Sequence, residues 1–360
     1  MTTRTTGQVH IIGAGLLGTS IGLTLRKLGV DVSLEDLSNA ATKLAIDFGA
    51  GRLLEEKDEV GLVVVCVPPD SAADKVIEAL ARFPLATVTD VASVKGKILA
   101  NVRATAEESF RYVGSHPMAG REKGGTLSGR PDLFVGRPWV IIEDDASESD
   151  CVSKVEMLAL DLGASPIRMS ADDHDRAVAL VSHAPQIISS LLASRLSDAT
   201  DYELSLAGQG LRDTTRIAGS DPALWLQILS ANSTQVVPIL QKLNLELTDL
   251  IHALDNPDSS GSLTNIAKIL SAGNLGISRI PGKHGGKSKE YSQVVVMIDD
   301  KPGELARLLT EIGAAGINLE DLNLDHASGA LIGLVEISVL PELEADLVKL
   351  LQANHWKLAG

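Results

Sequence analysis

The stretch VHIIGAGLLGTSIG, residues 9–22, decides the fold of the first part of this chain. Residues 9–14 have the apolar character of a buried strand, and residues 16–28 have the apolar spacing of a helix. A G-x-G-x-x-G pattern joins the two, formed by Gly13, Gly15 and Gly18. The first glycine allows a tight turn, the second admits a pyrophosphate, and the third lets the helix pack on the strand, so the pattern predicts a dinucleotide site.

An acidic residue after the second predicted strand, residues 30–35, supports this interpretation. Asp36 would accept hydrogen bonds from the adenine ribose and would repel a 2′-phosphate, which favours NAD over NADP. Glu35 is adjacent and could share that role. Further predicted cofactor contacts flank the glycines and follow the third strand; they are Leu16, Leu17, Val67 and Pro68. The alternative is a glycine-rich turn in an α/β protein that binds no nucleotide.

The order of predicted elements gives the domain organisation. Strands at 9–14, 30–35, 62–67, 85–91 and 138–142 alternate with helices, which predicts a doubly wound α/β domain of the Rossmann type over residues 1–171. Residues 172–280 are almost entirely helical in pattern, and residues 281–290, rich in Pro, Gly and Lys, predict a linker. Residues 291–360 follow the order βαββαβ, which is the ferredoxin-like motif.

Composition excludes several classes of function. A formal net charge of −15 argues against nucleic acid or an anionic membrane as partner, because either would be repelled. The two cysteines are far apart and form neither a disulfide framework nor a zinc motif. His174 and His183 are spaced wrongly for a helical ligand pair, so we expect no metal. No apolar run nears the roughly 18 residues of a membrane span and no signal peptide is evident, so we expect a cytoplasmic protein.

Two loops after predicted strands carry candidate catalytic residues. His116 lies in GSHPMAGREKGG, residues 114–125, which we expect to be neither helix nor strand. Its glycines permit close approach of a substrate, and an imidazole of ordinary pKa, about 6.5, is mostly neutral at pH 7 and can accept a hydroxyl proton. The alternative is a structural or merely exposed histidine. Ser93, in DVASVKGKI, residues 90–98, could donate to a substrate oxygen or to the nicotinamide, or could cap the next helix.

The helical region carries candidate substrate ligands. Arg212 and Arg216 would share one face if their segment is helical, and two guanidiniums on so acidic a protein would form a carboxylate receptor. The alternative is a solvated face on which they pair with Asp213 or Asp221. SHAPQ, residues 182–186, places two more candidates on a helix, His183 and Gln186. His183 is equally suited to a packing role.

The motifs GAGLLGTSIG, DVASVK, GSHPMAGRE, SHAPQ and RDTTRIA occur in this order, and together they resemble the prephenate/arogenate dehydrogenases of tyrosine biosynthesis. The later stretch DDKPGELARLLTEIGAAGINLEDL resembles the ACT regulatory domain. The resemblance implies that His116 is the catalytic histidine, that Ser93 lies beside the ring hydroxyl and the nicotinamide, and that Arg216 binds a substrate carboxylate. It also implies a polar gate over the pocket, formed by Glu122, Arg212 and Asp213, and a helical domain that forms a homodimer.

The implied function is NAD-dependent oxidative decarboxylation of prephenate to 4-hydroxyphenylpyruvate. Hydride leaves the ring carbinol carbon, His116 takes the hydroxyl proton, and the ring carboxylate departs as CO₂. Some prephenate-specific members have a second histidine where this chain has Gln186, so arogenate is the alternative substrate.

The ACT resemblance implies an amino-acid effector near Gly303 and Asn318, with tyrosine the obvious hypothesis. The alternative is a dimerisation module that binds nothing. Two other classes are a β-hydroxyacid-type dehydrogenase and a non-catalytic amino-acid sensor. GSHPMAG and the two arginines argue against the first, and an intact His116 argues against the second.

Overall fold

The computed structural model describes residues 3–120, 124–281, 291–326 and 332–359. Glu122 and positions 282–290 of the expected linker therefore lie outside the described residues. Internal contacts divide the chain into two compact units, Met1–Ser194 with Thr215–Lys242, and Arg195–Thr214 with Leu243–Gly360. The predicted boundaries near residues 171 and 280 follow changes of secondary-structure type instead, so each unit combines pieces of different predicted domains.

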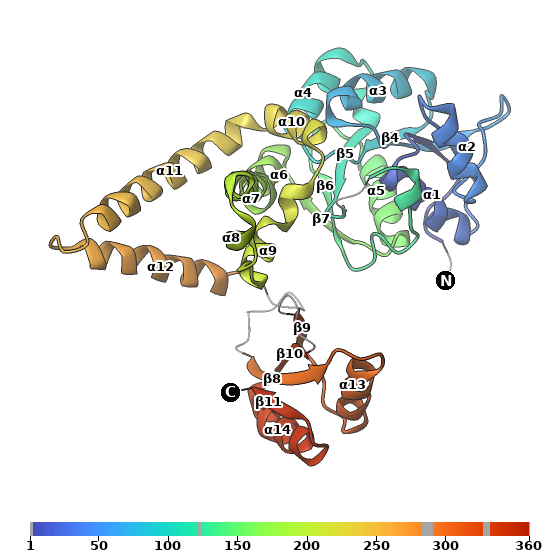
Figure 1. The fold of residues 1–360 in the computed structure, drawn as a ribbon. Coiled ribbons are helices and arrows are strands. Elements are labelled where there is room, and N and C mark those ends of the chain that lie inside the picture. Colours follow the sequence, from blue (N-terminus) through green and yellow to red (C-terminus); the bar gives the residue numbers. More distant parts are fainter. Residues whose placement is uncertain (1–2, 121–123, 282–290, 327–331, 360) are drawn as a thin grey trace. The chain divides into compact units, whose positions relative to one another are not determined.

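The first unit contains a seven-stranded sheet of order β2-β1-β3-β4-β5-β6-β7 (Figure 1). Its strands are β1 (Gln8–Ile12), β2 (Val32–Glu35), β3 (Val60–Val65), β4 (Thr87–Asp90), β5 (Tyr112–Pro117), β6 (Pro138–Ile142) and β7 (Ser165–Met169). All neighbours pair in parallel except β5 and β6, which are antiparallel. The five predicted strands are confirmed, each within two residues at either end.

Helices cover both faces of this sheet, which confirms the doubly wound architecture. One hydrophobic cluster joins the sheet to α1 (Leu16–Lys27), α2 (Asn39–Asp47) and α5 (Ser149–Asp161). A second cluster joins the opposite face to α3 (Pro69–Arg82) and α4 (Gly96–Thr105). Since both faces of the central strand β3 are covered, its sequence is a nearly continuous apolar run rather than an alternating one.

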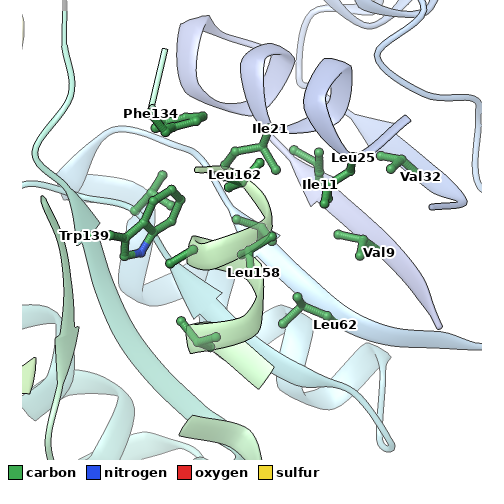
Figure 2. Packing of buried hydrophobic residues seen from close by; sticks show 14 of the residues in the cluster. Val9, Ile11, Ile21, Leu25, Val32, Leu62, Phe134, Trp139, Leu158 and Leu162 are labelled. Atoms are coloured by element: carbon green, nitrogen blue, oxygen red, sulfur yellow. The ribbon is translucent and has the colours of Figure 1, made fainter. Parts of the chain in front are cut away.

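The core of the first face shows how α1 is held at the glycine-rich turn. Ile21 and Leu25 of α1 lie against Ile11 of β1, with Leu158 and Leu162 from the end of α5 beside them (Figure 2). Each of these side chains is fully or almost fully buried. Burial of an aliphatic side chain of this size stabilises a fold by roughly 1.5–3 kcal/mol, so the position of the helix N-terminus is fixed by packing.

Two strands of the sheet are absent from the sequence prediction. The expectation that residues 114–125 begin without regular structure is wrong, because Tyr112–Pro117 forms β5 and His116 pairs with Val140 of β6. Gly114 and Ser115 have poor strand propensity, but ladders to β4 on one side and β6 on the other outweigh it. The edge strand β7 contains Pro166, which sequence rules discourage except at a sheet edge.

Helices dominate the chain from residue 171 to residue 280, as predicted. The first unit contains α6 (Ala171–Val178), a π-helical turn (Ala179–His183), α7 (Ala184–Ser194), a 3₁₀ turn (Arg216–Gly219), α10 (Pro222–Ala231) and the first residues of α11 (Ser233–Asp255). The second unit contains α8 (Asp201–Leu204), most of α9 (Gln209–Thr215), the rest of α11 and α12 (Ser262–Ser278).

One helical segment qualifies the expectation that no stretch is long enough to span a membrane. The segment Ala171–Asp198 reaches that length and a mean hydropathy of 1.4, and a third of its apolar window is buried inside the protein. Core helices of soluble proteins have the same length and composition, so this observation is weak support for a membrane span.

The C-terminal part of the second unit forms an antiparallel sheet of order β11-β8-β10-β9. Its elements are β8 (Ser292–Asp299), α13 (Glu304–Ala314), β9 (Asp321–His326), β10 (Ile332–Val339), α14 (Glu344–Ala353) and β11 (Lys357–Ala359). This is the predicted βαββαβ topology. The sheet and its two helices share one hydrophobic core, which includes Val296, Leu308 and Leu351.

Candidate active site

The glycine-rich turn has the geometry that a dinucleotide requires. Gly13 has a positive φ of 106°, and a Cβ there would lie 2.4 Å from the Cys66 carbonyl oxygen. A Cβ on Gly18 would lie 1.9 Å from the Gly13 carbonyl oxygen, so helix and strand approach too closely for a side chain. A Cβ on Gly15, in contrast, would meet no protein atom within 4 Å. The open side of the turn is therefore at the glycine that a pyrophosphate must approach.

The N-terminus of α1 is electrostatically suited to a phosphate. Gly15 is its N-cap, no side chain caps the first turn, and that turn contains no acidic residue. Its backbone N–H groups and the positive end of the helix dipole thus remain for an anion. Leu16 is buried and Leu17 half-buried in this turn. The predicted contacts Val67 and Pro68 follow β3 at the same carboxyl edge of the sheet, where Pro68 caps α3.

The structure separates the roles of the two acids after β2. Asp36 accepts a hydrogen bond from the Ala14 N–H, within the glycine-rich turn, at 2.7 Å. Glu35 instead accepts hydrogen bonds from the Arg82 guanidinium at 2.8 and 3.0 Å and lies 3.5 Å from His10. Hydrogen bonding to His10 and then to Arg82 lowers the pKa of Glu35 to about 2, against the effect of burial. Asp36 is therefore the acid beside the cofactor turn.

His116 lies near the end of β5, at the same carboxyl edge as the glycine-rich turn. The strands β1, β4 and β5 run in parallel, so the segments that follow β1 and β4 lie at this edge with the end of β5. Open α/β sheets bind ligands at such an edge. The His116 Nδ1 atom lies 2.8 Å from Nε2 of His174, on α6. Its Nε2 atom makes no hydrogen bond within the described part of the chain.

A buried ion pair holds the backbone of β5 immediately before His116. Lys95 is 1% exposed and donates to the Asp90 carboxylate at the end of β4. It also donates to the Ser115 carbonyl oxygen, at 2.8 Å, one residue before His116. The Tyr112 hydroxyl donates to the second oxygen of Asp90 at 2.6 Å. One cation thus connects the ends of two neighbouring strands at the position of the candidate base.

The environment of His116 favours the neutral imidazole. Burial lowers its pKa well below 6.5, and the positive charges that His174, Lys95 and His183 can carry add to that shift. At pH 7 the ring is therefore unprotonated and able to accept a proton. This strengthens the sequence argument, which assumed an ordinary histidine pKa.

Ser93 does not cap the following helix, which was the alternative left open by the sequence. The N-cap of α4 is Lys95, and the carboxylate of Asp175 on α6 accepts from the N–H groups of Lys95 and Gly96 at 2.9 and 2.8 Å. The Ser93 hydroxyl is half-buried and makes no hydrogen bond within the described residues. Its role beside substrate or nicotinamide stays a prediction.

His183 and Gln186 are both buried in the first unit. His183 accepts from Asn232 Nδ2 at 3.1 Å, and the same amide donates to the Asp175 carbonyl oxygen at 2.8 Å. Burial lowers the pKa of His183 to about 4, although the Asp175 charge opposes the shift. Within the described part of the chain, the side chain of Gln186 makes one hydrogen bond, to Ser190, at 3.4 Å. The structure therefore supports the packing role for His183, which the sequence had left open as the alternative to binding substrate.

The arginine pair does not lie on one α-helix. The helix α9 ends at Thr215, and Arg216 begins a 3₁₀ turn, because the α-helical hydrogen bonding stops between them. Arg216 is exposed in the first unit, where its turn packs against α7, the helix of Gln186. Arg212 and Asp213 are exposed residues of the second unit, and Asp213 accepts from Gln209 at 2.8 Å.

Sequence reasoning did not find His174 and Asp175 as partners of the site. The available signal was the adjacent pair His174 and Asp175 at the start of a predicted helix. From the sequence, His174 was weighed only as a metal ligand, together with His183. Among the described residues, no group of three or more His, Cys, Asp or Glu side chains could hold a metal ion.

A glycine-rich turn and a neutral histidine at one edge of a doubly wound sheet define a dinucleotide-dependent dehydrogenase. Comparison with known proteins then gives the family. The model of the prephenate dehydrogenase nucleotide-binding domain matches residues 21–168, and that of the prephenate dehydrogenase dimerization domain matches residues 170–270. The chain belongs to the prephenate dehydrogenase family.

Individual relatives agree with that assignment. The chain is 35% identical to a probable prephenate dehydrogenase, NovF, of Streptomyces niveus over 96% of this chain and 98% of the relative. It is 25% identical to a prephenate dehydrogenase of Bacillus subtilis over 92% and 91% of the two chains. The crystal structure of A. aeolicus prephenate dehydrogenase with hydroxyphenyl propionate and NAD⁺ is similar with a TM-score of 0.66 at 25% identity, covering 76% of this chain and 98% of that one.

Substitution of Gly18 should lower stability, whereas substitution of Gly15 should weaken NAD⁺ binding. Gly18→Ala should lower the melting temperature, because the added methyl overlaps the Gly13 carbonyl and overpacking of this kind costs roughly 1–3 kcal/mol. Gly15→Ala should melt like the wild type yet bind NAD⁺ about tenfold more weakly, as measured by titration calorimetry, since its methyl enters the open side of the turn. Equal NAD⁺ affinity in Gly15→Ala and wild type would place the pyrophosphate elsewhere.

The lowered pKa of His116 predicts an acid limb of activity below pH 6.5. The value of kcat/KM, measured from pH 5 to 8, should stay level down to about pH 6.5 and fall only below it. The free energy of unfolding should also fall below about pH 6.5, because there the unfolded state binds protons on His116 and His183 that the folded state does not. An inflection of kcat/KM at or above pH 6.5 would contradict a buried base.

Proposed function

We propose that this chain oxidises prephenate to 4-hydroxyphenylpyruvate with loss of CO₂, using NAD⁺. The observation that supports this most directly is the placement of His116. Its ring lies at the carboxyl edge of the sheet that bears the glycine-rich turn, it is neutral at pH 7, and its Nε2 has no partner within the described residues. Family membership supplies the substrate class, since the matched models and relatives are prephenate dehydrogenases.

The residues suit the chemistry of this reaction. Gly13, Gly15, Gly18 and Asp36 would hold NAD⁺, which would supply the acceptor for the hydride that leaves the ring carbinol carbon. His116 takes the hydroxyl proton, so that the oxygen can form a carbonyl. When the ring carboxylate leaves as CO₂, its bonding electrons enter the ring, and His116 returns the proton to the resulting phenolate oxygen. No proton is gained or lost overall, and base catalysis of this kind contributes about 10²–10⁴ in rate.

Other residues at the site are proposed to bind the substrate. The Ser93 hydroxyl would donate to the substrate oxygen, which its lack of a partner within the described residues permits. Arg216, exposed beside α7, would bind a substrate carboxylate. A gate formed by Glu122, Arg212 and Asp213 stays a prediction.

Arogenate is the second candidate substrate, and Gln186 is the observation that favours it. This residue is 6% exposed, and its only hydrogen bond within the described residues is the long contact to Ser190. Its amide is neutral, whereas a histidine at this position could carry a positive charge. An uncharged amide discriminates less against the ammonium group of arogenate.

We further propose that the protein is a homodimer. The match to a dimerization domain supports this, and so do large apolar side chains that the helices of each unit leave exposed. On α7 these include Ile188 and Leu191, and on α12 they include Leu263, Leu270, Leu275 and Ile277. Exposed apolar faces of this extent are typical of protein interfaces.

The C-terminal βαββαβ unit is proposed to be an ACT-type sensor of tyrosine. Gly303 has a positive φ of 95° and begins α13, so the turn after β8 presents backbone N–H groups. Asn318, before β9, is exposed and donates to Glu320 at 3.0 Å. These are the two positions that the resemblance assigns to an effector: Gly303 precedes α13, and Asn318 follows the C-terminus of the same helix.

Replacement of the proposed base tests the function. Wild-type enzyme should reduce NAD⁺, followed by absorbance, when prephenate is added, and should be compared with arogenate and with NADP⁺. His116→Asn should lose about 10²-fold or more in kcat and still bind NAD⁺, because the glycine-rich turn is unchanged. Asp172→Asn, an exposed substitution on α6, is the matched control and should react normally. A near-normal rate in His116→Asn would refute the base, and no wild-type turnover of either substrate would refute the function.

Tyrosine inhibition should depend on the C-terminal unit. Wild-type turnover should fall when tyrosine is added, and both a chain lacking residues 287–360 and the variant Asn318→Ala should need at least tenfold more tyrosine for the same inhibition. Asn318 is exposed, and its side-chain hydrogen bond among the described residues is the one to Glu320, so the variant should fold normally. Inhibition that persists unchanged in both proteins would place tyrosine in the active site instead.

A further inference from the structure

His116 is the first member of a buried chain of three side chains. Its Nδ1 lies 2.8 Å from Nε2 of His174, and Nδ1 of His174 lies 2.8 Å from Oδ1 of Asp175. His174 is fully buried and Asp175 is 6% exposed. The rings of the two histidines meet edge to face, with centroids 5.1 Å apart. Both partners lie on α6, and within the described residues this helix supplies the hydrogen-bond partner of His116 Nδ1.

The far end of this chain is a fixed carboxylate. Oδ1 of Asp175 accepts from the Lys95 N–H, and Oδ2 accepts from the Gly96 N–H, at the N-terminus of α4. Burial alone would raise the pKa of Asp175, but the hydrogen bonds from His174, Gly96 and Lys95 outweigh it and lower the pKa. The group is therefore ionised at pH 7, and a carboxylate can only accept hydrogen bonds.

That carboxylate determines where each proton lies. Nδ1 of His174 must carry a hydrogen in order to donate to Asp175. In a neutral imidazole the other nitrogen is then an acceptor, so Nε2 of His174 accepts from His116. Nδ1 of His116 must consequently carry its hydrogen, and Nε2 of His116 carries the lone pair.

We propose that His174 and Asp175 are positioning residues that hold His116 in the Nδ1–H tautomer, with Nε2 as the proton acceptor. This inference deepens the proposed function and rests on it, since Nε2 is the atom that receives the hydroxyl proton. The opposite tautomer would present an N–H to the hydroxyl and could not act as a base.

The same hydrogen bonds, through His174 to Asp175, stabilise His116 after it takes the proton. The imidazolium keeps its Nδ1–H bond to His174, whose own Nδ1–H points to the negative charge of Asp175. Lys95, whose charge is paired with that of Asp90, and His183 whenever it is protonated add positive charge near His116. Asp175 is thus the carboxylate connected to His116 by hydrogen bonds, and it offsets the charge that develops in the reaction.

A purely structural role for this cluster is the competing explanation. Asp175 caps α4, and its backbone carbonyl is held by Asn232, so replacing it would disturb the fold as well as the proton positions. His174 is the informative position, because its side-chain hydrogen bonds among the described residues are the two to His116 and Asp175. His174→Gln keeps a neutral acceptor for His116, whereas His174→Phe removes it.

The tautomer can be measured directly in the wild-type protein. Histidine ¹⁵N chemical shifts, recorded at pH 7 with NAD⁺ present, should show His116 protonated at Nδ1 and unprotonated at Nε2, with His116→Asn identifying the signals. Protonation at Nε2 in the wild type would overturn the proposal. This measurement needs no turnover, so it decides the proposal even if neither prephenate nor arogenate proves to be the substrate.

Kinetic measurements distinguish a positioning role of His174 from a purely structural role. His174→Phe should lower kcat about 10²-fold with KM within about twofold, and should shift the acid limb of the kcat profile, since tautomer and charge stabilisation are lost. His174→Gln should recover about tenfold of that loss. An unchanged kcat in folded His174→Phe would overturn the proposal. So would equal losses in both variants with the pH profile unchanged, because that result indicates packing alone.

Discussion

The buried pair of Lys95 and Asp90 is the interaction on which the active-site geometry depends. Lys95 is 1% exposed and Asp90 is fully buried, so neither charge is solvated by water. Asp90 ends β4, and Lys95 also binds the carbonyl of Ser115 on β5, which joins two adjacent strand ends. Removing one partner of such a pair leaves a buried, uncompensated charge and typically costs 3–5 kcal/mol. The loop that carries Ser93 and the strand that carries His116 are therefore held at one fixed separation.

A second fixed point lies on the other side of the same loop. Asp175 on α6 binds the backbone at the start of α4 and, through His174, the ring of His116. His116, the candidate base, is thus held through its backbone by the sheet and through its ring by a helix. A group that must present one lone pair to a hydroxyl benefits from both constraints, since a small misplacement of a catalytic group can cost much of its effect.

Local patterns were sufficient to predict most of the fold. Apolar runs identified five of the seven strands of the first sheet, because strands covered on both faces show their burial directly in the sequence. They could not identify β5, since Gly114 and Ser115 form a strand only through their neighbours β4 and β6. The condition for a shared arginine face, one continuous helix through Arg212 and Arg216, is not met, because α9 stops at Thr215 and the helical pattern gave no sign of this. The βαββαβ order of the C-terminal unit was predicted from its turns and apolar spacing.

The sequence by itself determined the cofactor turn, the acid that follows β2 and the identity of His116 as the candidate base. Each of these is a local motif, whose residues lie close together in the chain or directly after a predictable strand. The tertiary structure alone decided which acid faces the turn, that Ser93 is not a helix cap, and that His174 and Asp175 support His116. Those contacts join residues that lie far apart in the sequence, such as Gly96 and Asp175 or His116 and His174. No local pattern encodes such a pairing, because it arises only when the sheet brings its strand ends and the helix α6 together.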